Sequence, residues 1–221
     1  MIIAIVAFMF VGLTHAQTRF GIKAGANFST FTGKSYADVS MKTGFHAGGF
    51  AEIKASEKLF IQLELLYSEQ GAKIDMAHEL SDDVIYVDYD EKWNVNYLTV
   101  PVMVKYYVYQ GLHMEAGPQI GILLSAKEKY DTNFTSPDFP GESIKRSGSE
   151  DISELFKSID VALNAGVGYD FTSHIFANVR YSYGLSDIYD DQADRDQVGT
   201  GVNNKIVSRN NVLSLSVGYK F

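Results

Sequence analysis

The chain ends on the stretch NVLSLSVGYKF, residues 211–221, in which two kinds of side chain alternate. Apolar side chains stand at every second position from Leu213 to Phe221, and the positions between them hold small or polar residues. Successive side chains of a β-strand point to opposite faces, so this stretch predicts a strand with one apolar wall and one polar wall. A strand of this kind that ends on an aromatic residue is typical of a small transmembrane β-barrel.

Seven earlier stretches alternate in the same way and bring the number of predicted strands to eight. The predicted strands cover residues 19–28, 43–54, 58–73, 94–108, 112–124, 157–171, 174–185 and 211–221. Short connections lie at 55–57, 109–111 and 172–173, and long ones lie at 29–42, 74–92, 125–156 and 186–210. Outer-membrane barrels have an even number of strands, short periplasmic turns and long external loops. The sequence therefore predicts an all-β fold, an eight-stranded antiparallel up-and-down barrel with four long extracellular loops.

A soluble eight-stranded barrel of the lipocalin type is the alternative, because a period of two does not say which wall faces inward. Two features favour the membrane barrel. The polar wall is rich in glycine, which suits a crowded interior, and aromatic residues of the apolar wall gather near the strand ends as two girdles. The expected outer girdle contains Phe28, Phe45, Tyr67, Tyr181 and Tyr183, and the inner one contains Phe20, Tyr106, Tyr169, Phe171, Tyr219 and Phe221.

The first sixteen residues differ from the rest of the chain. The apolar run from Ile2 to Leu13 is too short to span a bilayer as a helix, and small residues follow it at Thr14 and Ala16. We therefore expect residues 1–16 to be a signal peptide and residues 17–221 to form an outer-membrane β-barrel domain.

Composition limits the chemistry that the chain can carry. It contains no cysteine, which excludes disulfides and thiolate metal sites. The net charge is −8, and the acidic residues are concentrated in the long connections that are expected to lie outside the cell. Nucleic-acid binding is disfavoured because no basic patch is evident.

Five stretches, taken in order, resemble one family. They read GIKAGANFS from Gly21, YLTVPVMVKY from Tyr97, EAGPQIGILLSAK from Glu115, NAGVGYDF from Asn164 and RYSYGLSDI from Arg180. In these stretches the chain resembles the PorT-type family of small bacterial outer-membrane β-barrel proteins. The resemblance implies a location in the cell outer membrane, and some members of that family are linked to protein secretion. It implies no catalytic residue and no cofactor.

Charged residues occur on the polar wall, and five of them, which come from five different predicted strands, mix both signs. They are Lys23, Glu64, Lys105, Glu115 and Arg180. An eight-stranded barrel is just wide enough for side chains to fill it, and an unpaired buried charge costs several kcal/mol. We therefore expect these side chains to pair as a structural network that plugs the barrel; a path for protons or small solutes is the alternative.

The last strand is also a candidate insertion signal. Its apolar wall, with Leu215, Val217, Tyr219 and Phe221, would be read by the barrel-assembly machinery when the protein enters the membrane. The expected partners are therefore outer-membrane lipid and this machinery. Segments 125–156 and 186–210 are candidate surfaces for a protein partner.

Other residues carry weaker hypotheses. Acidic residues in 74–92 and 186–210 can offer oxygen ligands to Ca²⁺, although neither run has the EF-hand spacing. A loosely triad-like group occurs at His78, Ser81, Asp82 and Asp83. Pro101 is expected to mark a bulge or bend, because it lacks a ladder N–H, and Trp93 is expected to anchor the barrel at the membrane interface.

These observations predict a non-enzymatic outer-membrane barrel with a structural or interaction role, in which acidic extracellular loops are presented to an envelope or secretion assembly. The alternative function is small-solute transport through a narrow pore. We expect no catalytic residue, metal site or cofactor.

Overall fold

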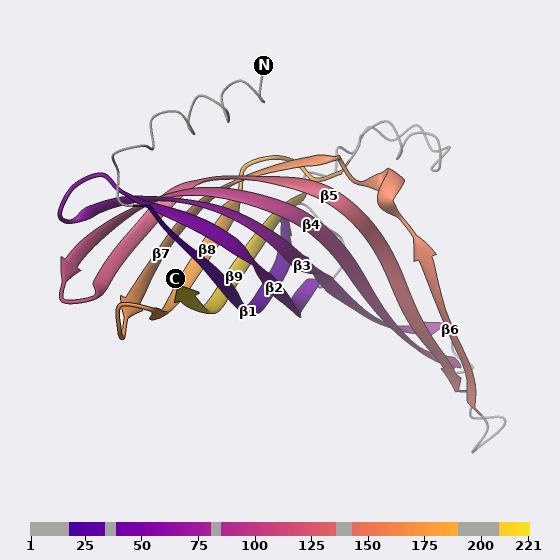
Figure 1. Ribbon diagram of the computed structural model, residues 1–221. Coiled ribbons are helices and arrows are strands. Elements are labelled where there is room, and N and C mark those ends of the chain that lie inside the picture. The colour runs from indigo at the N-terminus through magenta and orange to yellow at the C-terminus, as the bar shows by residue number, and fades with distance from the viewer. Residues whose placement is uncertain (1–17, 34–38, 81–84, 136–142, 190–207) are drawn as a thin grey trace.

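Antiparallel strands close into a ring in the computed structural model (Figure 1). The structure describes residues 18–33, 39–80, 85–135, 143–189 and 208–221. The predicted signal peptide, residues 1–16, lies outside the described residues. None of the helices in the described part of the chain has the length and apolar character needed to cross a membrane.

Eight strands form the ring. They are β1 (Thr18–Gly33), β2 (Val39–Lys54), β3 (Leu59–Leu80), β4 (Ile85–Tyr109), β5 (Leu112–Thr135), β7 (Ile159–Asp170), β8 (Ile175–Gly184) and β9 (Ser208–Lys220). Each strand pairs with its neighbour in this order, and β9 pairs with β1 to close the ring. The predicted up-and-down barrel of eight antiparallel strands is confirmed. Closure matters because lipid offers no partner for an unpaired backbone group.

The structure differs from the prediction at one end of the barrel, where β3, β4 and β5 run on beyond the ring (Figure 1). A ninth strand, β6 (Ser143–Asp151), pairs with the far half of β5, beyond the part that pairs with β7. Much of the predicted loops 74–92 and 125–156 is therefore sheet. Outside lipid the outer wall of a strand need not be apolar. The alternation of apolar and polar residues by which the barrel strands were predicted is therefore weaker there. We call β6 and the parts of β3, β4 and β5 beyond the ring the projecting sheet.

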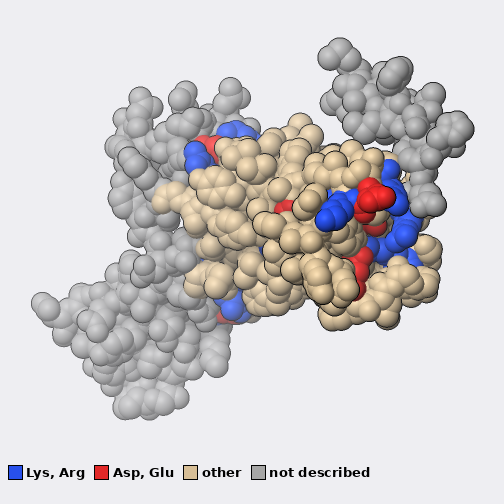
Figure 2. Space-filling view, turned by 90° about the vertical axis from the view of Figure 1, so that its left-hand side faces the viewer, with Lys and Arg blue, Asp and Glu red and all other residues tan. Residues whose placement is uncertain are grey.

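The outer wall of the barrel is apolar. Side chains such as Ile22, Leu65, Ile120 and Val217 are exposed on it, and the predicted aromatic girdle residues, including Phe20 and Phe221, also point outward. Figure 2 shows the end of the barrel that lies at the left of Figure 1; the charged side chains visible there gather mainly at one edge, and most of the described surface is uncharged. The apolar wall of this barrel therefore faces outward, whereas a lipocalin buries its apolar wall.

Short turns join the strands at the opposite end from the projecting sheet. Between β4 and β5 the turn contains Gly111, whose φ of 85° is readily adopted by glycine. Of the two features predicted at Pro101, a bulge or a bend, the bulge is absent: Pro101 pairs with Gln119 and Val104 with Ala116, so the register is the same on both sides. The register instead shifts between Asn96 and Tyr97, where the projecting sheet leaves the barrel.

Candidate functional site

The middle of the barrel interior holds a cluster of four charged side chains around Arg180. Its guanidinium donates to both oxygens of Glu64, at 2.9 Å from Nη1 and 2.7 Å from Nη2, and its Nε donates to Glu115 at 2.8 Å. Lys23 Nζ lies 3.1 Å from Glu64 Oε2, the oxygen that also accepts from Arg180 Nη1. The four residues come from β8, β3, β5 and β1, and all are buried. Two cations face two carboxylates, so the cluster has no net formal charge.

A second charged cluster fills the end of the barrel where the short turns lie. Lys105 donates to Glu52 at 2.8 Å, and Lys220 lies 3.4 Å from the other Glu52 oxygen and 2.7 Å from Asp170. The two ammonium groups lie 5.4 Å and 5.3 Å from the centre of the Phe176 ring, within the range of cation–π attraction. These contacts tie β2, β4, β7, β8 and β9 together.

Uncharged polar side chains occupy the interior beyond the first cluster. His46 bonds to Asn27 and to Ser216, each at 2.8 Å, and Asn27 also donates to Ser68 at 3.0 Å. A void of only about 20 Å³ remains beside Lys23 and these side chains, which is room for about one water molecule.

Aromatic side chains fill the interior where the projecting sheet begins. The Trp93 ring packs on Phe31, Phe156 and Tyr189, with centroids 6.1, 5.9 and 5.9 Å away. Phe156 follows a short 3₁₀ helix, η2 (Ser153–Leu155), and forms an isolated β-bridge with Tyr189. We call these four side chains the aromatic cap.

The cap corrects one prediction. Trp93 was expected to face lipid as an interface anchor, but it lies on the inner wall, and its indole N–H donates to the Glu91 carboxylate. The alternation of side chains along the strand explains this position, because it places Trp93 on the same wall as the buried residues Val95 and Tyr97. Its position next to a predicted loop obscured this.

The cap lies beside a pair of carboxylates beyond the barrel wall. Glu91 of β4 is buried next to Glu128 of β5. Burial, and then repulsion by the Glu128 charge, raise the pKa of Glu91 from 4.5 to about 7. The Glu91 carboxyl therefore titrates near neutral pH.

The five charged residues predicted for the interior lie in both clusters. Lys23, Glu64, Glu115 and Arg180 meet in the central cluster, and Lys105 joins the second one. Sequence reasoning did not single out Glu52, Asp170 or Lys220, although Glu52 and Lys220 alternate in phase with the inner wall. In the last strand, Leu215, Val217, Tyr219 and Phe221 all point outward, and the Phe221 N–H donates to the Phe20 carbonyl at 2.8 Å.

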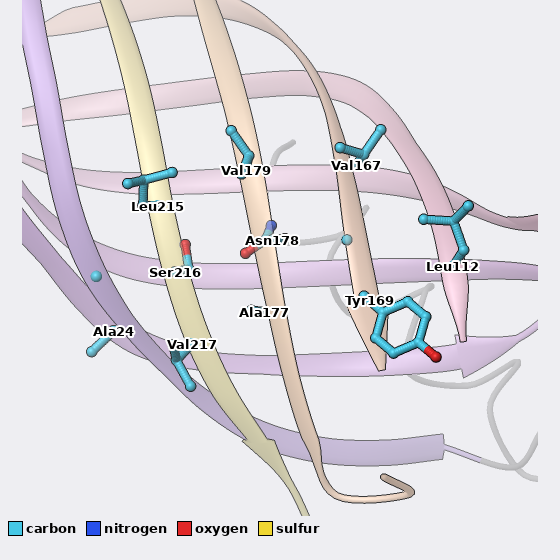
Figure 3. Close-up of a pocket in the computed structure, with 12 residues that line it drawn as sticks. Ala24, Leu112, Val167, Tyr169, Ala177, Asn178, Val179, Leu215, Ser216 and Val217 are labelled. Atoms are coloured by element: carbon cyan, nitrogen blue, oxygen red, sulfur yellow. The ribbon is translucent and has the colours of Figure 1, made fainter. Parts of the chain in front are cut away.

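Other candidates are not assembled into a site. His78 and Asp83, with the remaining members of the triad-like group, lie where the structure describes no side chains. Within the described residues, no group of three or more His, Asp or Glu side chains is placed to hold a metal ion. An apolar hollow of about 440 Å³ lies on the outer wall over β7, β8, β9 and β1, where Ala24, Ala177 and Val217 line it (Figure 3). It faces lipid and holds no charged side chain.

Residues 15–190 match the family described as "Outer membrane protein beta-barrel domain". No curated protein sequence matches the chain.

Several solved structures resemble the chain at low identity. Ail, the attachment invasion locus protein of Yersinia pestis, is 14% identical with a TM-score of 0.42, covering 92% of this chain and 98% of its own. Neisserial surface protein A is 13% identical with a TM-score of 0.42, covering 91% and 97%. OprG from Pseudomonas aeruginosa is 14% identical with a TM-score of 0.40, covering 94% and 97%.

Proposed function

We propose, from the premise that this chain belongs to the outer-membrane-protein β-barrel domain family and lies in the cell outer membrane, that its barrel is a sealed, non-enzymatic anchor which presents the projecting sheet outside the cell. One observation carries the proposal: charged, polar and aromatic side chains follow one another through the described part of the interior, and the void beside Lys23 and His46 is only about 20 Å³. The surface available to partners is then the projecting sheet, not the lumen.

The central cluster supports a structural role for the interior charges. Arg180 forms a bidentate ion pair with Glu64, which fixes the relative orientation of the two side chains as well as balancing their charges. Opening a path past it would leave two buried carboxylates without their main cation, at a cost of several kcal/mol. This energy disfavours the alternative function, transport of small solutes.

Conductance tests the sealed barrel. The purified protein, inserted into planar lipid bilayers, is expected to give no steady openings at neutral pH and moderate voltage. A heat-denatured sample controls for detergent leaks, and a known porin controls for insertion and detection. Steady openings of the native protein would overturn the proposal in favour of transport.

The finer family assignment belongs to the same proposal. We infer that the chain is a PorT-type barrel, on the strength of the stretches around Pro101 and Arg180, and that it acts within an envelope or secretion assembly. Partners would dock on segment 125–156, which contains β6, or on segment 186–210. Crosslinking in native membranes, followed by purification of the full chain, tests this: reproducible partners at these segments support it, and none over repeated trials contradicts it.

The last strand supports a role in insertion. Its outward wall ends on Phe221, which is 69% exposed, beside Tyr219 at a ring distance of 5.6 Å. We infer that the assembly machinery reads this edge before β9 pairs with β1. Phe221→Ala is expected to lower the assembled fraction, seen as heat-modifiable gel mobility, while Phe171→Ala, an exposed aromatic on the same rim, is the control. Equal assembly of both variants would contradict this role.

A further inference from the structure

The strand β6 forms one edge of the projecting sheet. In the described part of the chain β6 pairs with β5 alone, so the backbone groups on its other side have no strand beside them. Figure 1 shows β6 at the margin of the projecting sheet, which curves away from the ring. Such an edge is a template for pairing with another chain, and proteins often block it with a proline or a bulge. β6 contains no proline, and its register with β5 is continuous.

The sequence of β6 places opposite charges at equal distances from a glycine. Residues 145–151 read KRSGSED, with Arg146 two positions before Gly148 and Glu150 two positions after it. Arg146 and Glu150 point to the same face of the strand, because an even number of positions separates them, and both are exposed. In its charges, the strand is therefore complementary to a reversed copy of itself.

Neither charge is balanced by the neighbouring strand. Glu150 is directly opposite Glu128 of β5, and like charges in this arrangement destabilise a sheet. Arg146 is opposite Thr132 of β5. In both cases the positions two residues to either side on β5, which share the same face, carry no charged side chain. Among the described residues, no ion pair is formed by Arg146 or Glu150.

Antiparallel pairing of two copies of β6 about Gly148 brings the opposite charges together. Gly148 is then opposite Gly148 of the second copy, and Arg146 of each copy is opposite Glu150 of the other. Cross-strand pairs of opposite charge stabilise a sheet, and two-fold symmetry forms this pair twice. Pairing about Ser147 or Ser149 leaves both charges without an opposed partner, and parallel pairing in register places like charges opposite each other. The charges therefore select the register centred on Gly148.

An aromatic ring lies over the glycine at the centre of this register. A Cβ atom at Gly148 would overlap the ring and hydroxyl of Tyr130 of β5, so this ring leans across the edge strand. Opposed Cα atoms of antiparallel strands are about 4.5–5.5 Å apart. The Tyr130 rings of two paired copies would therefore approach each other over the two glycines and add apolar contact to the two ion pairs.

We propose that the protein forms a two-fold symmetric dimer in the outer membrane through β6, which joins the four-stranded projecting sheets of two copies into one continuous sheet. This inference rests on the proposed role of the projecting sheet as the contact surface, and it names a second copy of this chain as the partner. The oligomeric state tests the dimer and conductance tests the sealed barrel, so that either proposal can fail alone.

Charge reversal tests the pairing in the purified full-length protein, whose mass in detergent is measured by sedimentation equilibrium. Arg146→Glu and Glu150→Arg should each weaken the dimer by about tenfold or more, because two pairs of opposite charge become two pairs of like charge. An equimolar mixture of these two variants should dimerise as the native protein does, since both cross-strand pairs are again of opposite charge.

Two control variants make the same changes of charge at the other end of the barrel. Lys58→Glu matches Arg146→Glu, and Glu57→Lys matches Glu150→Arg; both residues lie on an exposed turn. Each control variant should dimerise as the native protein does.

A disulfide tests the register, because the chain contains no cysteine and each variant then has one thiol. Ser147 is opposite Ser149 of the second copy, and opposed Cα atoms are close enough for a disulfide. Two copies of Ser147 are diagonal neighbours about 7–8 Å apart, which is too far. Differently tagged Ser147→Cys and Ser149→Cys variants, co-expressed and mildly oxidised in the outer membrane, should form the mixed dimer several-fold more than either variant crosslinks to itself.

Three results of the charge test would overturn the proposal: a native protein that stays monomeric across the micromolar range, equal dimerisation of the native protein and a folded Arg146→Glu variant, or a mixture that does not recover the dimer. Efficient crosslinking of Ser147→Cys to itself would overturn the register and, with it, the role of the charges. Capture of a different protein by the cysteine variants, without the dimer, would assign the edge to another partner and also overturn the proposal. If a charge-reversed variant does not fold, the cysteine variants decide.

Discussion

The Arg180 guanidinium on β8 joins the Glu64 carboxylate on β3 through two hydrogen bonds, of 2.9 and 2.7 Å, across the inside of the barrel. The two strands are not neighbours in the ring. Arg180 also holds Glu115 on β5 at 2.8 Å, so one side chain links three separate parts of the wall. A contact of this kind fixes the cross-section of the barrel in a way that the strand ladders alone do not.

Loss of this contact should weaken the barrel strongly. Arg180→Gln leaves Glu64 with Lys23 as its only ion-pair partner and leaves Glu115 without its cation, and breaking a buried pair from one side costs about 3–5 kcal/mol. Urea unfolding of the protein in lipid vesicles should show a midpoint shifted down accordingly. Lys58→Gln, on an exposed turn, is the control, and an unchanged midpoint in Arg180→Gln would show that the cluster does not stabilise the fold.

Trp93 is the only tryptophan of the chain, so its fluorescence reports on the aromatic cap. The Glu91 pKa is about 7 in the folded protein against 4.5 as its ordinary value, so the folded state holds this proton more tightly than the unfolded state does. The contribution of Glu91 to the free energy of unfolding is therefore largest below about pH 4.5, and it is lost as the pH rises to about 7. Fluorescence should change with a midpoint near pH 7.

A substitution isolates the group responsible. Glu91→Gln keeps an acceptor for the Trp93 indole but removes the charge, so the transition near pH 7 should disappear and the cap should resist unfolding better at pH 8. Glu57→Gln, on an exposed turn at the other end of the barrel, is the control. A midpoint that persists in Glu91→Gln would assign the titration to another group.

Much of the barrel follows from alternation, and the exceptions have physical causes. The outer wall could be predicted because lipid requires apolar side chains there, whereas β6 and the far ends of β3, β4 and β5 lie beyond lipid and lack that pattern. Alternation also assigns a residue to the inner wall without naming its partner. Lys105 pairs with Glu52 and not with Glu64, because such contacts depend on the stagger of strands around the ring.

Trp93 illustrates the same limit. A tryptophan beside a predicted loop is usually an interface anchor. Its neighbours in space, Phe31, Phe156 and Tyr189, are far away in the sequence, so no local pattern predicts the cap.

Close packing of the inner wall predicts an effect at Gly168 of β7, which pairs with His113 of β5. A Cβ atom at Gly168 would overlap the His113 ring and lie 3.0 Å from the Ala177 carbonyl oxygen. Gly168→Ala should therefore destabilise the barrel by about 1–3 kcal/mol, measured by urea unfolding in vesicles.

Two comparisons make that test specific. At Gly49 the nearest atom to a new Cβ is 3.6 Å away, so Gly49→Ala should fold as the native protein does. Adding His113→Ala to Gly168→Ala relieves the overlap with the ring, although it also removes a buried side chain, so a smaller loss than the sum of the two single variants is expected. If the losses of stability in the two single variants add up to the loss in the double variant, the His113 ring does not cause the effect of Gly168→Ala.

The layers of the interior predict that the aromatic cap stabilises the protein but is not its only seal. Phe156→Ala removes a buried ring that packs on Phe31, Trp93 and Tyr189, and such a truncation costs about 3–5 kcal/mol. The Arg180 cluster and the Lys105–Glu52 cluster beneath the cap stay intact in this variant. Planar bilayers should therefore show no steady conductance from Phe156→Ala, even though Trp93 fluorescence shifts to the red and unfolding occurs at lower urea. Steady openings in this variant alone would make the cap the gate of the barrel and the charged clusters insufficient to close it.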